Sequence, residues 1–125
     1  MTDGTAAKKI LIVEDEETSR KVITLALRRP GRELLFAHDG EEAVRIAAAE
    51  RPVLIVMDMM LPKLDGFQAT LRIKGDPALA AIPIVALTAR TGDFDEKKAR
   101  EAGCVDYITK PYRIDHLRTR LAPYL

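Results

Sequence analysis

The hydrophobic residues of this chain occur in two patterns, continuous runs and residues at helical spacing. Five runs predict strands, at Ile10–Val13, Leu34–Ala37, Val53–Met57, Ile84–Leu87 and Tyr107–Thr109. Apolar residues at helical spacing predict amphipathic helices, most clearly around Val22–Leu27, Ala43–Ala48 and Ile114–Leu121. Two weaker helices are expected at Phe67–Lys74 and Asp93–Ala102. Strands and helices therefore alternate along the chain.

This alternation predicts an α/β fold with a doubly wound parallel sheet, because parallel neighbours are joined by right-handed helical crossovers. The uninterrupted apolar runs suit strands that are buried on both faces. Boundary residues agree with this division of the chain. Asp39 followed by Glu42 resembles a helix capping box. Pro30-Gly31 is expected to stop the first helix, and Gly103 is expected to cap the fourth.

Composition narrows the range of functions. The 125 residues, 47% hydrophobic and 31% charged, fit a single domain over residues 1–125 with a flexible N-terminal tail at residues 1–7. A formal net charge of +1 gives no overall reason to expect binding to nucleic acid or to an anionic membrane. The single cysteine cannot form an internal disulfide, and no run resembles a membrane span or an export signal. We therefore expect a cytoplasmic protein.

Polar residues follow four of the five predicted strands. Glu14 and Asp15 follow the first, Asp58 the third, Thr88 the fourth and Lys110 the fifth. In doubly wound sheets the carboxyl ends of the strands form the ligand crevice, so these groups are expected to meet. Two carboxylates ~4 Å apart repel by about 4 kcal/mol at an effective dielectric of ~20, so a cation is needed. Carboxylate oxygens suit Mg²⁺, and a lysine suits a phosphate group.

Taken singly, each of these residues has an ordinary structural explanation. Acids at Glu14–Glu17 suit the amino terminus of a helix. Asp58 suits a turn, and Thr88 suits a local hydroxyl contact. Lys110 alone reads as a solvated surface lysine. Their coincidence at four strand ends is what favours a functional site.

Four sequence segments carry a resemblance to a known family. They are ILIVEDEE, VLIVMDMMLPKLDG, IPIVALTAR and AGCVDYITKP, which occur in that order at suitable spacing and span nearly the whole chain. On these segments the chain resembles the response regulator receiver domain of two-component signalling. The resemblance implies a flavodoxin-like (βα)5 fold, with a five-stranded parallel sheet in the strand order 2-1-3-4-5.

The resemblance also implies which residues hold the metal ion. Asp58 would be the phosphorylated aspartate. Glu14, Asp15, Asp58 and the backbone carbonyl of Met60 would bind Mg²⁺, for which Mn²⁺ can substitute. Asp15 would bind the metal directly and Glu14 mostly through water. Met60 and Arg90 occupy the two positions that tune loss of the phosphate, and their combination implies a slow loss.

A further set of residues would contact the phosphoryl group and respond to it. Thr88, Ala89 and Lys110 match the residues that contact this group. Thr88 and Tyr107 match a switch pair, in which the threonine moves toward the phosphate and the aromatic ring rotates into the vacated space. The Lys110–Pro111 peptide bond is expected to be cis, which proline makes accessible.

These assignments imply a signalling protein rather than an enzyme with a separate substrate. A histidine kinase or a histidine phosphotransfer protein would supply the phosphoryl group. The domain would catalyse its own Mg²⁺-dependent phosphorylation and later dephosphorylation. The face formed by the fourth helix, the fifth strand and the fifth helix would then bind a downstream protein partner or output domain. The same face could form a weak homodimer of an otherwise monomeric protein, with no direct contact to nucleic acid or membrane.

Three other functions remain as alternatives at this point. A phosphohydrolase of the haloacid dehalogenase type would need an acid two residues after its nucleophile, where this chain has Met60. A flavin or nucleotide binder would need a glycine cradle, which the loop EDEETS lacks. A receiver-shaped scaffold that signals without phosphate would not need the complete set of polar residues. The sequence leaves the kinase, the partner and the length of the natural protein open.

Overall fold

The computed structural model of the protein describes residues 7–88 and 93–125, and for residues 93–95 it describes the backbone alone. Residues 1–6 and 89–92 lie outside these ranges. The predicted flexible tail therefore falls outside the described residues, except for Ala7. The predicted site residues Ala89 and Arg90 also lie outside them.

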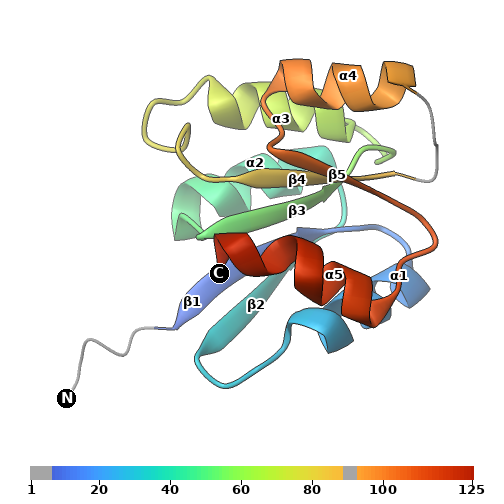
Figure 1. Ribbon diagram of the computed structural model, residues 1–125. Coiled ribbons are helices and arrows are strands. Elements are labelled where there is room, and N and C mark those ends of the chain that lie inside the picture. Colours follow the sequence, from blue (N-terminus) through green and yellow to red (C-terminus); the bar gives the residue numbers. More distant parts are fainter. Residues whose placement is uncertain (1–6, 89–92) are drawn as a thin grey trace.

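Five parallel strands form one sheet in the order β2-β1-β3-β4-β5, as Figure 1 shows. The strands are β1 (Lys8–Val13), β2 (Arg32–Ala37), β3 (Leu54–Asp58), β4 (Ile84–Thr88) and β5 (Asp106–Thr109). The helices are α1 (Glu17–Leu27), α2 (Gly40–Glu50), α3 (Gly66–Lys74), α4 (Asp93–Ala102) and α5 (Ile114–Leu121), followed by a short 3-10 helix at Ala122–Tyr124. The predicted fold and strand order are confirmed.

Two apolar layers cover the two faces of the sheet. α1 and α5 pack together on one face, while α2, α3 and α4 lie on the other (Figure 1). Successive strand residues alternate between these layers, as Ile10 and Ile12 do on the α1 and α5 side and Leu11 and Val13 on the other. This double burial explains why the strands read as continuous apolar runs.

Helix ends agree with most of the predicted boundaries. Asp39 caps α2, because its side chain accepts a hydrogen bond from the backbone N–H of Glu42 at 2.8 Å. Glu42 reaches back one residue beyond the cap and accepts from the backbone N–H of His38 at 2.6 Å. Gly103 follows α4 with φ +117, and the N–H groups of Gly103 and Cys104 close the helix end on the carbonyls of residues 100 and 99.

The end of α1 agrees with the prediction. The helix stops at Leu27, and its cap residue Arg28 is extended with φ −67 and ψ 134, two residues before Pro30, which cannot continue a helix. Arg32 and Arg118 donate hydrogen bonds to the last carbonyls of α1. Gly31 supplies the positive φ of +87 in the turn that leads into β2.

The loop after β3 passes close to the strand that it leaves, and glycine makes this approach possible. The N–H of Gly66 donates to the carbonyl of Met59 at 3.2 Å. A Cβ atom at Gly66 would lie 2.3 Å from the carbonyl oxygen of Asp58. Because no larger residue fits there without moving the backbone, Gly66 fixes the position of Asp58 relative to α3.

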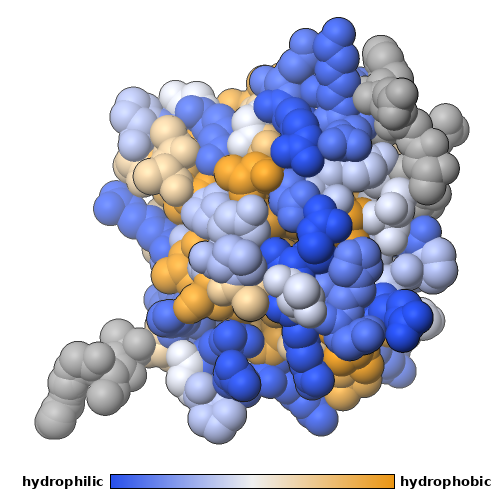
Figure 2. Space-filling model, viewed as in Figure 1, coloured by the Kyte–Doolittle hydropathy of each residue, from blue (hydrophilic) through white to orange (hydrophobic). Residues whose placement is uncertain are grey.

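The face shown in Figure 2 is predominantly polar, since hydrophilic residues cover most of it and apolar residues form separate patches. No helix in the described part of the chain has the length and apolar character that spanning a membrane requires. The larger hydrophobic residues that remain exposed are Leu25, Phe36, Val53, Met60, Leu71 and Val105.

Candidate functional site

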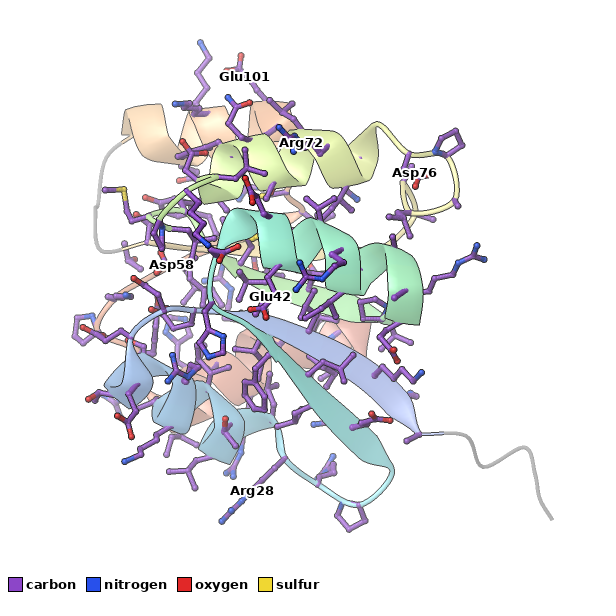
Figure 3. All side chains as sticks on the ribbon, turned by 180° about the vertical axis from the view of Figure 1, so that it is seen from behind. Arg28, Glu42, Asp58, Arg72, Asp76 and Glu101 are labelled. Atoms are coloured by element: carbon purple, nitrogen blue, oxygen red, sulfur yellow. The ribbon has the colours of Figure 1, made fainter. Side chains whose placement is uncertain are left out.

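The polar residues that follow the strands meet at the carboxyl edge of the sheet. Glu14 and Asp58 are fully buried there, with exposed fractions of 0% and 2%, while Asp15 is exposed. Figure 3 shows Asp58 at this edge, where the loops after the strands gather. Thr88 and Lys110 lie at the same edge, where the backbone N–H of Lys110 donates a hydrogen bond to the carbonyl of Thr88 at 2.7 Å.

Lys110 lies between the two buried carboxylates. Its Nζ is 3.5 Å from Glu14 Oε1 and 3.7 Å from Asp58 Oδ2. The other Asp58 oxygen accepts a hydrogen bond from the backbone N–H of Met60 at 2.9 Å. Glu14 Oε1 also accepts from the backbone N–H of Glu16 at 3.2 Å. One lysine thus faces two buried acids and the exposed Asp15 beside them.

The pKa values of both buried acids reflect this excess of negative charge. Burial, then the charge of Asp58 and a hydrogen bond with it, raise the pKa of Glu14 to about 7, although Lys110 and the N–H of Glu16 oppose the shift. Burial also raises the pKa of Asp58, against the opposing effects of the Met60 N–H and Lys110. At neutral pH the site therefore favours binding of a proton or a cation.

The arrangement suits a hard divalent cation. Glu14, Asp15 and Asp58 each offer a carboxylate oxygen, and these oxygens lie within 4.8 Å of one another. Glu14 Oε2 is buried, and no hydrogen-bond donor among the described residues reaches it. A cation coordinated by carboxylates and water would relieve both the repulsion and this unsatisfied oxygen. The donor atoms present therefore fit Mg²⁺, whereas the role of the Met60 carbonyl stays a prediction.

The remaining predicted site residues are positioned as follows. Thr88 ends β4 and is 2% exposed. Tyr107 lies half-buried on β5, paired in register with Ala86 of β4, and it packs against the core layer on the α4 side. The Lys110–Pro111 bond is cis. The switching roles of Thr88 and Tyr107 stay predictions.

Tyr112 is a residue of the site that the sequence analysis missed. Its ring lies beneath Lys110, with the ring centroid 5.8 Å from Nζ, and its hydroxyl is buried without a partner among the described residues. Burial, followed by the charges of Glu14 and Asp58, raises the pKa of this hydroxyl. The only sequence signal is an aromatic residue just after Pro111, and it does not reveal the side on which the ring packs.

Comparison with known proteins relates this chain to response regulators. The chain matches the family described as response regulator receiver domain over residues 10–122. DivK of Brucella anthropi, a polar-differentiation response regulator, is 36% identical over 118 residues that make up 94% of this chain and 96% of DivK. PhoP of Bacillus subtilis, an alkaline phosphatase synthesis transcriptional regulatory protein, is 40% identical over 118 residues, 94% of this chain but 48% of PhoP. This chain thus spans about half the length of PhoP.

A solved structure adds a comparison of the fold and of the site. The receiver domain of the sensor histidine kinase PA1611 from Pseudomonas aeruginosa PAO1 superposes with a TM-score of 0.85 at 37% identity. The match covers 95% of this chain and 98% of that domain. That structure holds a magnesium ion coordinated in its active site cleft.

The raised pKa of Glu14 predicts how stability depends on pH when no metal is bound. In the folded protein Glu14 keeps its proton up to about pH 7, whereas the unfolded chain loses it near the ordinary value of 4.5, so folding becomes less favourable as pH rises between these values. Glu14→Gln should remove this penalty. In EDTA at pH 8 we expect the variant to exceed wild type in the free energy of unfolding by on the order of 3 kcal/mol, since each tenfold change in proton affinity corresponds to about 1.4 kcal/mol.

Urea unfolding at pH 5 and pH 8 measures this difference. The advantage of Glu14→Gln should shrink toward pH 5, and saturating Mg²⁺ should cancel or reverse it at pH 8. Glu101→Gln, a change of an exposed acid, is the matched control and should behave like wild type at both values. An equal difference between Glu14→Gln and wild type at the two pH values would contradict the electrostatic account.

Proposed function

The chain belongs to the response regulator receiver domain family of two-component signalling, and from this premise we propose that Asp58 accepts a phosphoryl group from a histidine kinase or a histidine phosphotransfer protein. The observation that best supports this role is the environment of Asp58. It is a buried carboxylate with a lysine 3.7 Å from one oxygen and a backbone N–H 2.9 Å from the other. Asp58 therefore lies at the edge of the sheet among groups that stabilise transferred negative charge.

The proposed reaction is an in-line displacement at phosphorus. A carboxylate oxygen of Asp58 forms the new P–O bond while the bond from phosphorus to the donor breaks, and the electron pair leaves with the donor imidazole. Lys110 binds the phosphoryl oxygens as their charge develops, and Thr88 donates a hydroxyl hydrogen bond to them. When bound by Glu14, Asp15 and Asp58, Mg²⁺ supplies charge neutralisation and alignment at the same oxygens.

The domain would therefore supply its own catalysis, both in gaining and in losing the phosphate. Small acyl phosphates such as acetyl phosphate should serve as donors for the same reason. The resulting aspartyl phosphate is hydrolysed by water, which ends the signal. No separate substrate is turned over, so we propose a phosphoacceptor with Mg²⁺-dependent self-phosphorylation and self-dephosphorylation, in which Mn²⁺ can replace Mg²⁺.

The proposed output surface is the face formed by α4, β5 and α5. Asp106 of β5 forms ion pairs with Arg120 of α5 and with Arg100 of α4, the latter at 3.8 Å. Arg120 also donates to the carbonyl of Tyr107 at 3.2 Å. The three elements are thus joined through the strand that carries the proposed switch residue. A shift of Thr88 and Tyr107 would change this network, and with it the affinity for a downstream partner or a second copy of the domain.

Intact mass spectrometry tests the phosphorylation directly. Incubation with acetyl phosphate and Mg²⁺ should add the mass of one phosphoryl group to the wild-type chain. EDTA should prevent the addition, and Asp58→Asn should abolish it. Asp76→Asn is the matched control, because Asp76 accepts a hydrogen bond from the N–H of Ala78 in the loop after α3, far from Asp58 in Figure 3, and its loss should leave phosphorylation intact. A phosphate that persists in Asp58→Asn would refute the assignment of the acceptor.

Thr88→Ala separates phosphorylation from switching. We expect the variant to gain phosphate within a few-fold of the wild-type rate, since Asp58, Lys110 and the metal ligands remain. The amide NMR shifts that phosphorylation induces in β5 and α5 should be largely lost, because the hydroxyl that contacts the phosphate is absent. Thr24→Ala on α1 is the control. Wild-type shifts in phosphorylated Thr88→Ala would contradict the proposed switch.

The lifetime of the phosphate should be long, because the Met60 side chain cannot position a water molecule for attack. Met60 lies two residues after Asp58 and is 60% exposed, so its side chain is free to change without disturbing the core. In a label-decay assay Met60→Asn should shorten the lifetime several-fold, and Met60→Leu should leave it unchanged. Loss of the phosphate from the wild-type protein within seconds would contradict the proposal that Met60 lengthens the lifetime of the phosphate.

A further inference from the structure

We propose that a pocket at the carboxyl end of α1 binds a compact polyanion that carries a di- or triphosphate group. The pocket is a cavity of about 440 Å³ lined by four arginines, Arg28, Arg29, Arg32 and Arg118, with apolar wall from residues that include Leu27 and Leu125. It lies where α1 and α5 end and β2 begins. The proposed phosphorylation site is at the opposite end of the strands (Figure 1).

Two of the arginines are held in place by the end of α1. Arg32 Nη1 donates to the carbonyl of Leu27 at 2.9 Å. Arg118 Nε donates to the carbonyl of Ala26 at 3.2 Å, and its Nη2 donates to that of Leu25 at 3.3 Å. A guanidinium has five N–H donors, so donors remain on both residues. These bonds position two cationic groups before any ligand arrives, which lowers the entropic cost of binding.

The four arginines of this pocket form no salt bridge with an acidic side chain within the described part of the chain. The oxygen of Leu125, which also lines the pocket, accepts a hydrogen bond from Lys8 Nζ at 2.7 Å. Burial, and secondarily the charge of Arg29, lower the pKa of Arg32. Like charges held together without a counter-ion create a local field that an anion would relieve.

Helix capping explains only half of the cluster. Cations at a helix carboxyl end are favourable, and Arg32 and Arg118 satisfy α1 carbonyls in this way. Arg28 and Arg29 make no such bond in the described structure, yet they line the same cavity. Figure 3 shows Arg28 pointing outward beyond the end of α1, away from Asp58. These two residues are therefore available to a ligand.

The chemistry of the ligand follows from the number and type of the cations. Guanidinium groups pair two donors with two phosphate oxygens, and four of them match the several negative charges of a di- or triphosphate. A single carboxylate would leave most of them unpaired. The net charge of +1 and the small size of the cavity favour a small anion over nucleic acid or a membrane surface, which need an extended basic face.

Calorimetric titration in EDTA tests this site without engaging the metal site. Wild type should bind inorganic triphosphate and pyrophosphate more tightly than orthophosphate. Titration with ATP and GTP distinguishes a free polyphosphate from a nucleotide, because tighter binding of a nucleotide would show that its base contacts the apolar wall. Binding of orthophosphate as tight as that of triphosphate would overturn the proposed ligand class.

A charge-matched pair of double variants tests the location. Arg28→Gln/Arg29→Gln removes two cations that make no helix-capping bond and should weaken triphosphate binding by at least about tenfold. Arg45→Gln/Arg72→Gln removes the same charge from exposed positions on α2 and α3 and should leave binding within about twofold. Thermal unfolding by circular dichroism verifies that both variants fold.

Equal weakening in the two double variants, or no triphosphate binding by wild type, would overturn the proposal. Binding to duplex DNA or to anionic vesicles that exceeds triphosphate binding and depends on Arg28 and Arg29 would also overturn it in favour of a macromolecular partner. Because the titrations exclude Mg²⁺ and acetyl phosphate, their outcome is independent of whether Asp58 is phosphorylated.

Discussion

The central constraint on this protein is the negative charge buried at the carboxyl ends of β1 and β3. Glu14 and Asp58 have almost no contact with solvent, and Lys110 is the cation that the described structure places between them. Such an arrangement is unfavourable unless a proton or a cation compensates it. The same property makes the site suitable for signalling, because a group that is costly to leave uncompensated responds strongly to metal binding and to phosphorylation.

The rest of the fold serves to hold these groups in register. Two apolar layers pack against the two faces of the sheet. Gly66 allows the loop after β3 to pack against the carbonyl of Asp58. The hydrogen bond from the backbone N–H of Lys110 to the carbonyl of Thr88 places the lysine and the threonine side by side. From there β5 leads to Asp106, whose ion pairs with α4 and α5 connect the site to the proposed output face. Membership of the receiver family argues against the hydrolase and nucleotide-binding alternatives.

The sequence predicted those features that depend on local pattern. The apolar runs located the strands, Asp39 marked the start of α2, and polar residues after the strands located the acidic cluster, because parallel strands end at one edge. The features that it missed depend on tertiary contacts. Arg118, 92 residues away along the chain, donates to the last carbonyls of α1, and the position of Tyr112 depends on how the loop after β5 packs. The arginine pocket has the same origin, since its members come from two distant segments, residues 26–32 and 118–125.

The most direct test of the central claim is anomalous diffraction from crystals grown with Mn²⁺. The account predicts one strong anomalous peak at the carboxyl edge of the sheet, within coordination distance of the Asp15 and Asp58 carboxylates and near Glu14. In crystals of Asp58→Asn the peak should be weak or absent. A peak elsewhere, or no peak beside these carboxylates at a saturating concentration of Mn²⁺, would contradict the claim that the buried charge exists to hold a divalent cation.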